Sequence, residues 1–119
     1  MLWEVEYTDE FAEWWDTLTA KEQESIDPGV LLLQELGPAL GRPWVDTIKT
    51  SRHTNMKELR SRGGHIRALF AFDPRRTAIL LIGGDKRDRW TAWYTQMVPI
   101  ADQLYDDHLA TLKREGELR

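Results

Sequence analysis

The chain has 119 residues, no cysteine and a net charge of −4 at pH 7, which fits a single domain and excludes disulfide bonds and thiolate metal sites. No basic segment precedes an apolar run in residues 1–13, and the longest apolar runs, at 30–33 and 78–82, are far shorter than the roughly 20 residues that span a membrane. Neither export nor membrane insertion is therefore expected, and the lack of cysteine agrees with a reducing, cytoplasmic location.

The first 18 residues predict a strand followed by a helix. Apolar and polar residues alternate over 3–7, which is typical of a strand with one buried face. Thr8 is a candidate N-cap for a helix that continues to about Leu18. Trp14 and Trp15 are adjacent on this helix and cannot both point straight at a core, so one of them is expected to be partly exposed.

A second helix is predicted to begin after Thr19, because Glu22 follows it at the spacing of a capping box. Apolar residues recur at helical spacing as far as Leu36, and Gly37-Pro38 stops the pattern. Pro28 predicts either a kink just before it or a new helical start at the proline itself. The two helices are expected to form an αα-hairpin that covers one face of a sheet.

The middle of the chain predicts an antiparallel meander. Residues 41–55 form a polar connection with a short strand around Val45, and strands follow at 56–60, 66–72 and 77–82. Gly63-Gly64 and residues 73–76 supply the turns between these strands.

The last predicted element is a helix. After Gly83-Gly84 a polar loop leads through Trp90 into an apolar helical pattern that continues to Leu112 and is interrupted by Pro99. The chain contains no repeat, low-complexity run or linker, so residues 1–119 are predicted to form one α+β domain.

The charges are distributed unevenly along the chain. Residues 1–41 contain ten acidic residues and one basic residue, whereas residues 42–89 contain twelve basic and five acidic residues. A basic middle between acidic flanks can form one electropositive face, which is typical of proteins that bind a polyanion. The alternative is that these charges are solvated on strands and turns and bind nothing.

Three of the predicted strands carry the motifs Lys57-Glu58-Leu59-Arg60, Ile66-Arg67-Ala68-Leu69-Phe70-Ala71-Phe72 and Ala78-Ile79-Leu80-Leu81-Ile82. In this order they resemble the centre of the phage-derived, HigB-like toxin family within the RelE/ParE superfamily. The following Gly83-Gly84-Asp85-Lys86 replaces the apolar residues and lysine pair usual in that family, and it looks like an actinobacterial-style branch. Lys86 is then the residue that matches the family's lysine.

The resemblance implies a RelE-like, microbial RNase-like fold, in which an antiparallel sheet of about four to five strands is flanked by an N-terminal αα-hairpin and a C-terminal helix. It also implies the toxin of a type II toxin-antitoxin system. Such a toxin is an mRNA interferase, an endoribonuclease that cleaves messenger RNA on the ribosome and so inhibits translation. The implied partner is a cognate helix-turn-helix (HTH) antitoxin, which neutralises the toxin in a hetero-oligomer. No cofactor is implied, and the three dispersed histidines predict no metal site.

RNA cleavage without a metal needs a base for the 2′-hydroxyl, positive charge for the phosphate and an acid for the leaving 5′-oxygen. Arg60 and Arg67, if they lie on neighbouring strands, would present two guanidinium groups to one phosphate, and Lys86 would complete this catalytic group. Glu58 shares a strand face with Arg60 and is the candidate base. The alternative for Glu58 is an ordinary cross-strand ion pair with one of the arginines.

Further residues are candidates for binding the substrate. They are Lys57, His65, Arg87, Arg89 and Trp90. The rings of Trp90, Trp93 and Tyr94 suggest stacking on RNA bases, although Trp93 is expected in the core. His53 and His65 are alternative acid or base residues that are also compatible with solvated turns.

Two other classes of function are compatible with the sequence. One is a catalytically inactive RelE-fold binding module that acts with an HTH antitoxin in transcriptional autoregulation. The other is a nucleic-acid-binding protein without turnover, which would hold phosphate with the same arginines.

Overall fold

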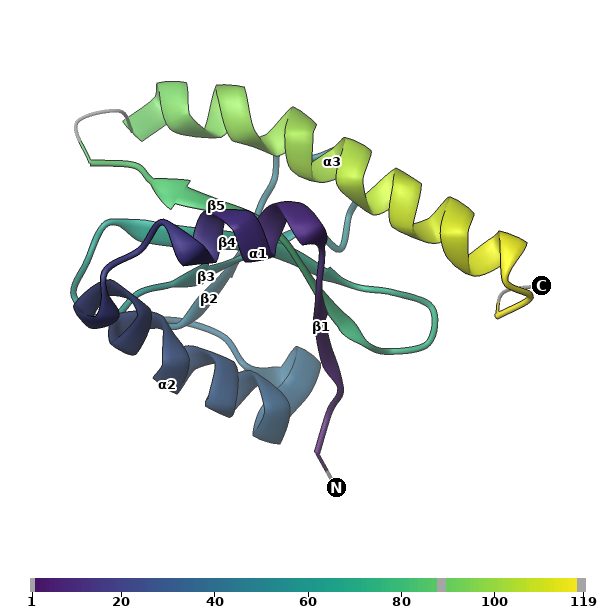
Figure 1. Cartoon of the computed structure of the whole chain (residues 1–119), viewed down its shortest axis with the longest axis horizontal. Helices are drawn as coiled ribbons and strands as arrows, with labels where there is room; N and C mark the ends of the chain where they lie inside the picture. The colour runs from purple at the N-terminus through teal and green to yellow at the C-terminus, as the bar shows by residue number, and fades with distance from the viewer. Residues whose placement is uncertain (1, 88–89, 118–119) are drawn as a thin grey trace.

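A five-stranded sheet lies between helices in this structure, a computed structural model that describes residues 2–87 and 90–117 (Figure 1). The elements in chain order are β1 (Val5–Tyr7), α1 (Asp9–Asp16), α2 (Ala20–Leu36), the 3₁₀-helix η1 (Gly37–Ala39), β2 (Val45–Thr47), β3 (Lys57–Arg60), β4 (Ile66–Phe72), β5 (Ala78–Asp85) and α3 (Trp90–Arg114). In Figure 1, α3 runs along one side of the sheet and α2 along the other. The α+β fold predicted from the sequence is confirmed.

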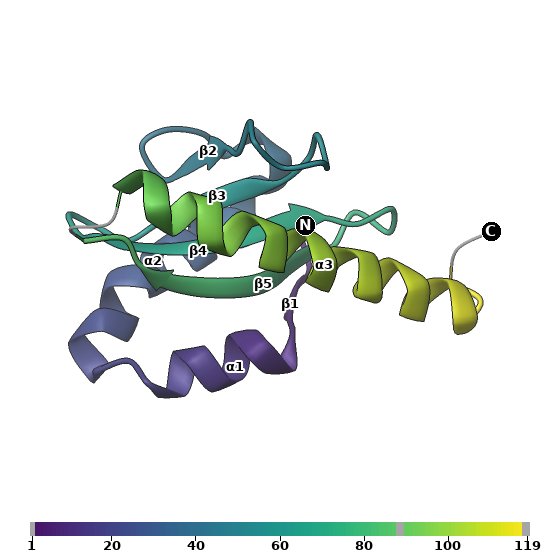
Figure 2. The same cartoon turned by 90° about the horizontal axis from the view of Figure 1, so that it is seen from above.

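The strand order across the sheet is β1-β5-β4-β3-β2. Figure 2 shows β2, β3, β4 and β5 in this order, with α1 alongside β5. The β3–β4 and β4–β5 pairings are antiparallel, as the meander predicted. β2 also pairs with β3 in antiparallel, whereas β1 pairs with β5 in parallel. The short strand predicted around Val45 is β2, and it forms one edge of the sheet.

Side-chain caps begin both N-terminal helices at the predicted residues. The Thr8 hydroxyl accepts a hydrogen bond from the Phe11 amide at 2.9 Å. Thr19 and Glu22 form the complete capping box, with distances of 3.1 and 2.8 Å. Helix α1 ends at Asp16, two residues before the predicted end, because the chain must leave the helix before it reaches the second cap.

Pro28 lies inside α2 without ending it. The helical start predicted as one alternative at Pro28 does not occur, because α2 is one helix whose buried face packs against the sheet on both sides of the proline. The Ser25 carbonyl, in the turn before Pro28, accepts a hydrogen bond from the Arg62 amide at 3.0 Å, so the β3–β4 turn is attached there. Gly37, with φ of +56°, ends the helix as predicted.

Each face of the sheet has its own hydrophobic core. The core under α1 and α2 contains Phe11, Ile26, Leu33, Leu40, Val45, Leu59, Ile66, Ala68, Phe70, Ala78 and Leu80. The core under α3 contains Ile48, Met56, Leu69, Ala71, Ile79, Leu81, Trp93, Val98, Ala101 and Tyr105. Strand alternation divides the sheet residues between these two cores. Within the described ranges, no helix is long and apolar enough to cross a membrane.

β5 continues to Asp85, three residues beyond the end predicted at Ile82, and it contains a β-bulge. In its pairing with β4, Leu80 lies opposite Phe70 and Ile82 lies opposite Leu69, so Leu81 is the extra residue. The sequence predicted that the strand ends before Gly83-Gly84, but both glycines lie in the strand.

The two glycines of β5 allow a tryptophan to approach the strand from each side. A Cβ added to Gly83 would lie 2.3 Å from ring atoms of Trp14 on α1. A Cβ added to Gly84 would lie 2.5 Å from Nε1 of Trp93 on α3. The glycine pair is therefore a packing requirement of β5 and does not end the strand.

The Asp73 carboxylate attaches the C-terminal half of α3 to the β4–β5 turn. It is buried and pairs with Arg75 at 2.8 Å and with His108 of α3 at 2.9 Å. Burial alone would raise the pKa of Asp73, but the hydrogen bonds from His108 and Arg75 outweigh burial and hold this pKa below its usual value.

Candidate active site

Arg60 and Arg67 lie directly opposite each other on the antiparallel strands β3 and β4. Their side chains are on the α3 face of the sheet, together with Glu58, because these residues alternate with core residues of the other face. Glu58 Oε1 is 3.0 Å from Arg60 Nε and 3.7 Å from Arg67 Nε. The structure thus brings together three of the residues that the sequence selected.

Glu58 and Arg67 of this ion-pair group are buried, and the group is incompletely hydrogen-bonded. The exposed fraction is 2% for Glu58 and 8% for Arg67. Arg67 Nη1 donates to the carbonyl oxygens of Gly64 at 3.1 Å and Ile66 at 2.9 Å. Within the described residues, Glu58 Oε2 and Arg67 Nε are buried without a hydrogen-bond partner. Buried polar atoms are normally paired, so these two atoms are exceptions within the group.

Lys86 is the third cation of the group. It directly follows β5, and its exposed fraction is 5%. Its Nζ lies 3.4 Å from the Tyr94 hydroxyl and 5.3 Å from the centroid of the Tyr94 ring. Burial and the positive charge of Arg67 lower the pKa of Lys86, and the negative charge of Glu58 opposes this shift. A lysine with a lowered pKa is better suited to transfer a proton near neutral pH.

Tyr94 on α3 completes the group. Burial, with a further contribution from Glu58, raises the pKa of Tyr94 to about 12. Its hydroxyl therefore stays protonated at neutral pH and can donate a hydrogen bond. From the sequence, Tyr94 was considered only as a stacking residue, because its proximity to Lys86 depends on how α3 docks on the sheet.

A pocket of about 600 Å³ opens beside this group, between the β2–β3 edge of the sheet and the N-terminal half of α3. Its lining residues are Asp46, Thr47, Ile48, Lys49, Thr50, Glu58, Arg60, Thr91, Tyr94, Thr95, Val98, Pro99 and Asp102. Asp46, which the sequence did not indicate, contacts Arg60 at 3.2 Å. A hydrogen bond from Arg42 holds the pKa of Asp46 below its usual value.

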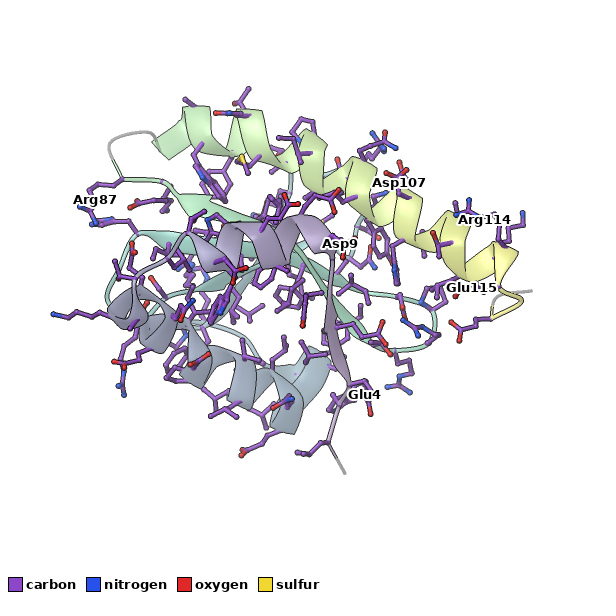
Figure 3. All side chains as sticks on the ribbon, viewed as in Figure 1. Glu4, Asp9, Arg87, Asp107, Arg114 and Glu115 are labelled. Atoms are coloured by element: carbon purple, nitrogen blue, oxygen red, sulfur yellow. The ribbon has the colours of Figure 1, made fainter. Side chains whose placement is uncertain are left out.

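The residues predicted to bind substrate are more dispersed. Lys57 lies on the α1/α2 face of the sheet, opposite to Glu58, because it alternates with that residue on β3. His65 and Arg87 are exposed near Lys86, and the His65 carbonyl accepts a hydrogen bond from the Lys86 amide at 3.0 Å. Figure 3 shows Arg87 at the end of the molecule where β5 leads toward α3. Arg89 and the side chain of Trp90 lie outside the described residues.

Several other predicted residues have roles in packing. Trp93 is buried in the core under α3, as expected. His53 is not a solvated turn residue: its Nε2 lies 2.7 Å from a carboxylate oxygen of Asp106 on α3. Trp14 and Trp15 are both half-buried against the core under α1 and α2.

The sheet and its flanking helices define the RelE-like fold class. An arginine double mutant of E. coli toxin RelE in the free state superposes with a TM-score of 0.62 at 11% identity, covering 83% of this chain and 97% of that chain. The RelE of the RelB-RelE antitoxin-toxin complex from Methanococcus jannaschii superposes with a TM-score of 0.57 at 11% identity, covering 73% of this chain and 96% of that chain. These similarities concern the fold alone.

The chain belongs to the phage-derived protein Gp49-like family, whose model matches residues 13–106. A Mycobacterium tuberculosis protein named "Putative toxin HigB2" is 48% identical over 100 residues, covering 82% of this chain and 50% of that protein. Another from the same organism, named "Putative toxin HigB3", is 49% identical over 98 residues, covering 82% of this chain and 86% of that protein. The match thus spans half the length of the first relative and most of the second. The resemblance to phage-derived, HigB-like proteins that the strand motifs indicated is confirmed.

Proposed function

We propose that this chain is the toxin of a type II toxin-antitoxin system and that it cleaves messenger RNA without a metal. The observation that carries the proposal is the group formed by Arg60, Arg67, Lys86 and Tyr94 around buried Glu58, beside a pocket of about 600 Å³. The names of the two M. tuberculosis relatives and of E. coli RelE support the toxin class.

In the proposed reaction, the RNA 2′-oxygen attacks the adjacent phosphorus and the bond from phosphorus to the 5′-oxygen breaks. The products are a 2′,3′-cyclic phosphate and a free 5′-hydroxyl. Glu58 Oε2, the unpaired atom, accepts the proton of the 2′-hydroxyl, and Lys86 Nζ donates a proton to the leaving 5′-oxygen. Arg60 and Arg67 stabilise the negative charge on the phosphate, and exchange with water restores both protonation states.

The proposed partners are a cognate HTH antitoxin and messenger RNA on the ribosome, in the cytoplasm. The fold similarity to the M. jannaschii RelE, which is described in an antitoxin-toxin complex, supports a hetero-oligomer of toxin and antitoxin.

One observation favours a second candidate, an inactive RelE-fold binding module that acts with its antitoxin in transcriptional autoregulation. Glu58 neutralises charge on both arginines, and Arg67 Nη1 is already bonded to two backbone carbonyls. A phosphate must compete with these contacts. In the inactive candidate, the ion pairs only stabilise the sheet.

Induced expression in a bacterial host separates the two candidates. The toxin predicts that growth stops within minutes and that primer extension finds new 5′ ends inside coding regions. Unchanged growth and transcripts, with soluble folded protein, would leave the binding module as the better account.

Two variants test the site within the same experiment. Arg67→Ala should abolish growth inhibition and leave co-purification with the antitoxin largely intact. Arg114→Ala is the control, because this exposed arginine lies at the far end of α3 (Figure 3). Full toxicity of Arg67→Ala would show that the site assignment is wrong.

A further inference from the structure

The pocket beside the catalytic group extends along α3, well beyond the residues that face the scissile phosphate. Tyr94, Val98 and Asp102 are spaced four residues apart and therefore form one stripe of the helix that lines it. Eight residues separate Tyr94 from Asp102, which corresponds to about 12 Å along the helix axis. The opposite wall is formed by residues 46–50 of β2 and the loop after it. The proposed mechanism makes no use of the end near Asp102.

Asp102 is a buried carboxylate with capacity for further hydrogen bonds. Its exposed fraction is 5%, and it lines the pocket. One oxygen accepts from the Ser51 hydroxyl at 2.5 Å and the other from the Arg52 amide at 3.2 Å. An ionised carboxylate offers about four acceptor positions, so two of them stay available.

The charge environment distinguishes Asp102 from the other carboxylates of the pocket. Glu58 and Asp46 both form ion pairs with Arg60. Asp102 forms no ion pair with the residues that the structure describes, so the hydrogen bonds from Ser51 and Arg52 alone offset the cost of burying its carboxylate. Additional N–H donors from a ligand would therefore satisfy this carboxylate, and the apolar side chains of Ile48 and Val98 beside it can contact a flat ring.

We propose that this end of the pocket binds one base of the RNA, next to the scissile phosphate, and that Asp102 selects guanine. The proposal rests on the RNA-cleaving function proposed above. A carboxylate only accepts hydrogen bonds, and guanine is the one RNA base with two N–H donors, N1–H and the N2 amino group, side by side on its Watson–Crick edge. Both can bond to the two oxygens of Asp102. The distance along α3 fits a nucleotide that flanks the cleaved bond.

The first experiment measures binding without cleavage. The probes are dinucleotides that lack the attacking 2′-hydroxyl, namely GpU and UpG against ApU and UpA, titrated into the isotope-labelled wild-type chain and followed by NMR. Because a bidentate contact to a base discriminates substantially, guanine should bind at least about tenfold more tightly than adenine. Equal affinity for both bases would overturn the proposal.

Three variants connect the preference to the pocket. Asp102→Asn keeps the size of the side chain but replaces one acceptor oxygen by an amide donor, and it should reduce the guanine preference about tenfold. Ser51→Ala is the matched control, because it removes a hydrogen bond to Asp102 and keeps the carboxylate, so the preference should persist. Thr95→Trp, at an exposed position that lines the pocket, should weaken the binding of every dinucleotide. A guanine preference that survives in Asp102→Asn would refute the role of this residue.

Cleavage mapping separates this proposal from the function on which it rests. If wild-type protein cleaves RNA next to every base with equal frequency, the function stands and guanine selection is wrong. If wild-type protein cleaves no RNA but binds the guanine dinucleotides selectively, the endoribonuclease is wrong and the guanine site stands.

Discussion

A double-mutant cycle between Glu58 and Arg67 tests how strongly the buried carboxylate offsets the buried guanidinium. Glu58 is 2% exposed and Arg67 is 8% exposed, with Oε1 and Nε 3.7 Å apart. Removing one partner of a buried ion pair typically costs about 3–5 kcal/mol, because the other charge stays buried. Glu58→Gln should therefore lower the free energy of unfolding by about 3 kcal/mol. Arg67→Met keeps much of the aliphatic stem and should cost about 2 kcal/mol, because Arg60 still pairs with Glu58.

The double variant should lose less stability than the two single variants together, by about 1–3 kcal/mol. Urea denaturation at pH 7 measures this coupling, and a loss of 3 kcal/mol moves the midpoint by about 1–3 M urea. The slope of the transition should stay constant, since the fold is the same. A coupling below about 0.5 kcal/mol would refute the argument that Glu58 compensates Arg67. If the coupling is that small and the Glu58→Gln variant stays folded but loses toxicity, Glu58 has a chemical role in the reaction.

Three further predictions follow from packing and charge. Gly83→Ala should destabilise the chain by about 1–3 kcal/mol because its Cβ meets the indole ring on α1, whereas Gly41→Ala, in open space, should leave the thermal midpoint nearly unchanged. Asp73→Asn should cost about 1–3 kcal/mol at pH 7. Folding lowers the pKa of Asp73, so this difference in stability should be complete above the ordinary pKa of 3.8. It should disappear as the pH falls through the lower pKa of the folded state. Urea titrations of both proteins at pH 7 and pH 3 measure the change. Glu58→Gln should lower the pKa of Lys86 further, since Glu58 raises it, and an NMR titration of the lysine side chain measures this shift.

The accuracy of the sequence-based fold prediction depended on how local each signal was. Thr8 and Thr19 were identified as caps because their hydrogen bonds join residues three positions apart. The end of β5 was placed wrongly because the apolar run stops at Ile82 and two glycines follow it. Both positions require glycine because two tryptophans that are distant in sequence pack against them, and neighbouring residues do not reveal these contacts.

The same distinction applies to the candidate site. Strand alternation alone puts Glu58 and Arg60 on one face, and the meander brings Arg67 opposite Arg60, so these residues could be selected in advance. The roles proposed for Tyr94 and Asp102 could not be foreseen. Both depend on the position of α3 over the sheet, which is set by packing between residues that are far apart in the sequence.

The bulge at Leu81 determines the face of the sheet on which Lys86 lies. Before the bulge, the β5 residues with odd numbers, such as Ile79, belong to the core under α3. After it, Gly84 meets Trp93 of α3, so residues with even numbers face that helix. With regular pairing Lys86 would instead point toward the helices formed by the acidic first third of the chain, because a shift of one residue reverses every side chain. The extra residue thus places the lysine beside Arg67, so a chain with net negative charge can still gather three cations around Glu58.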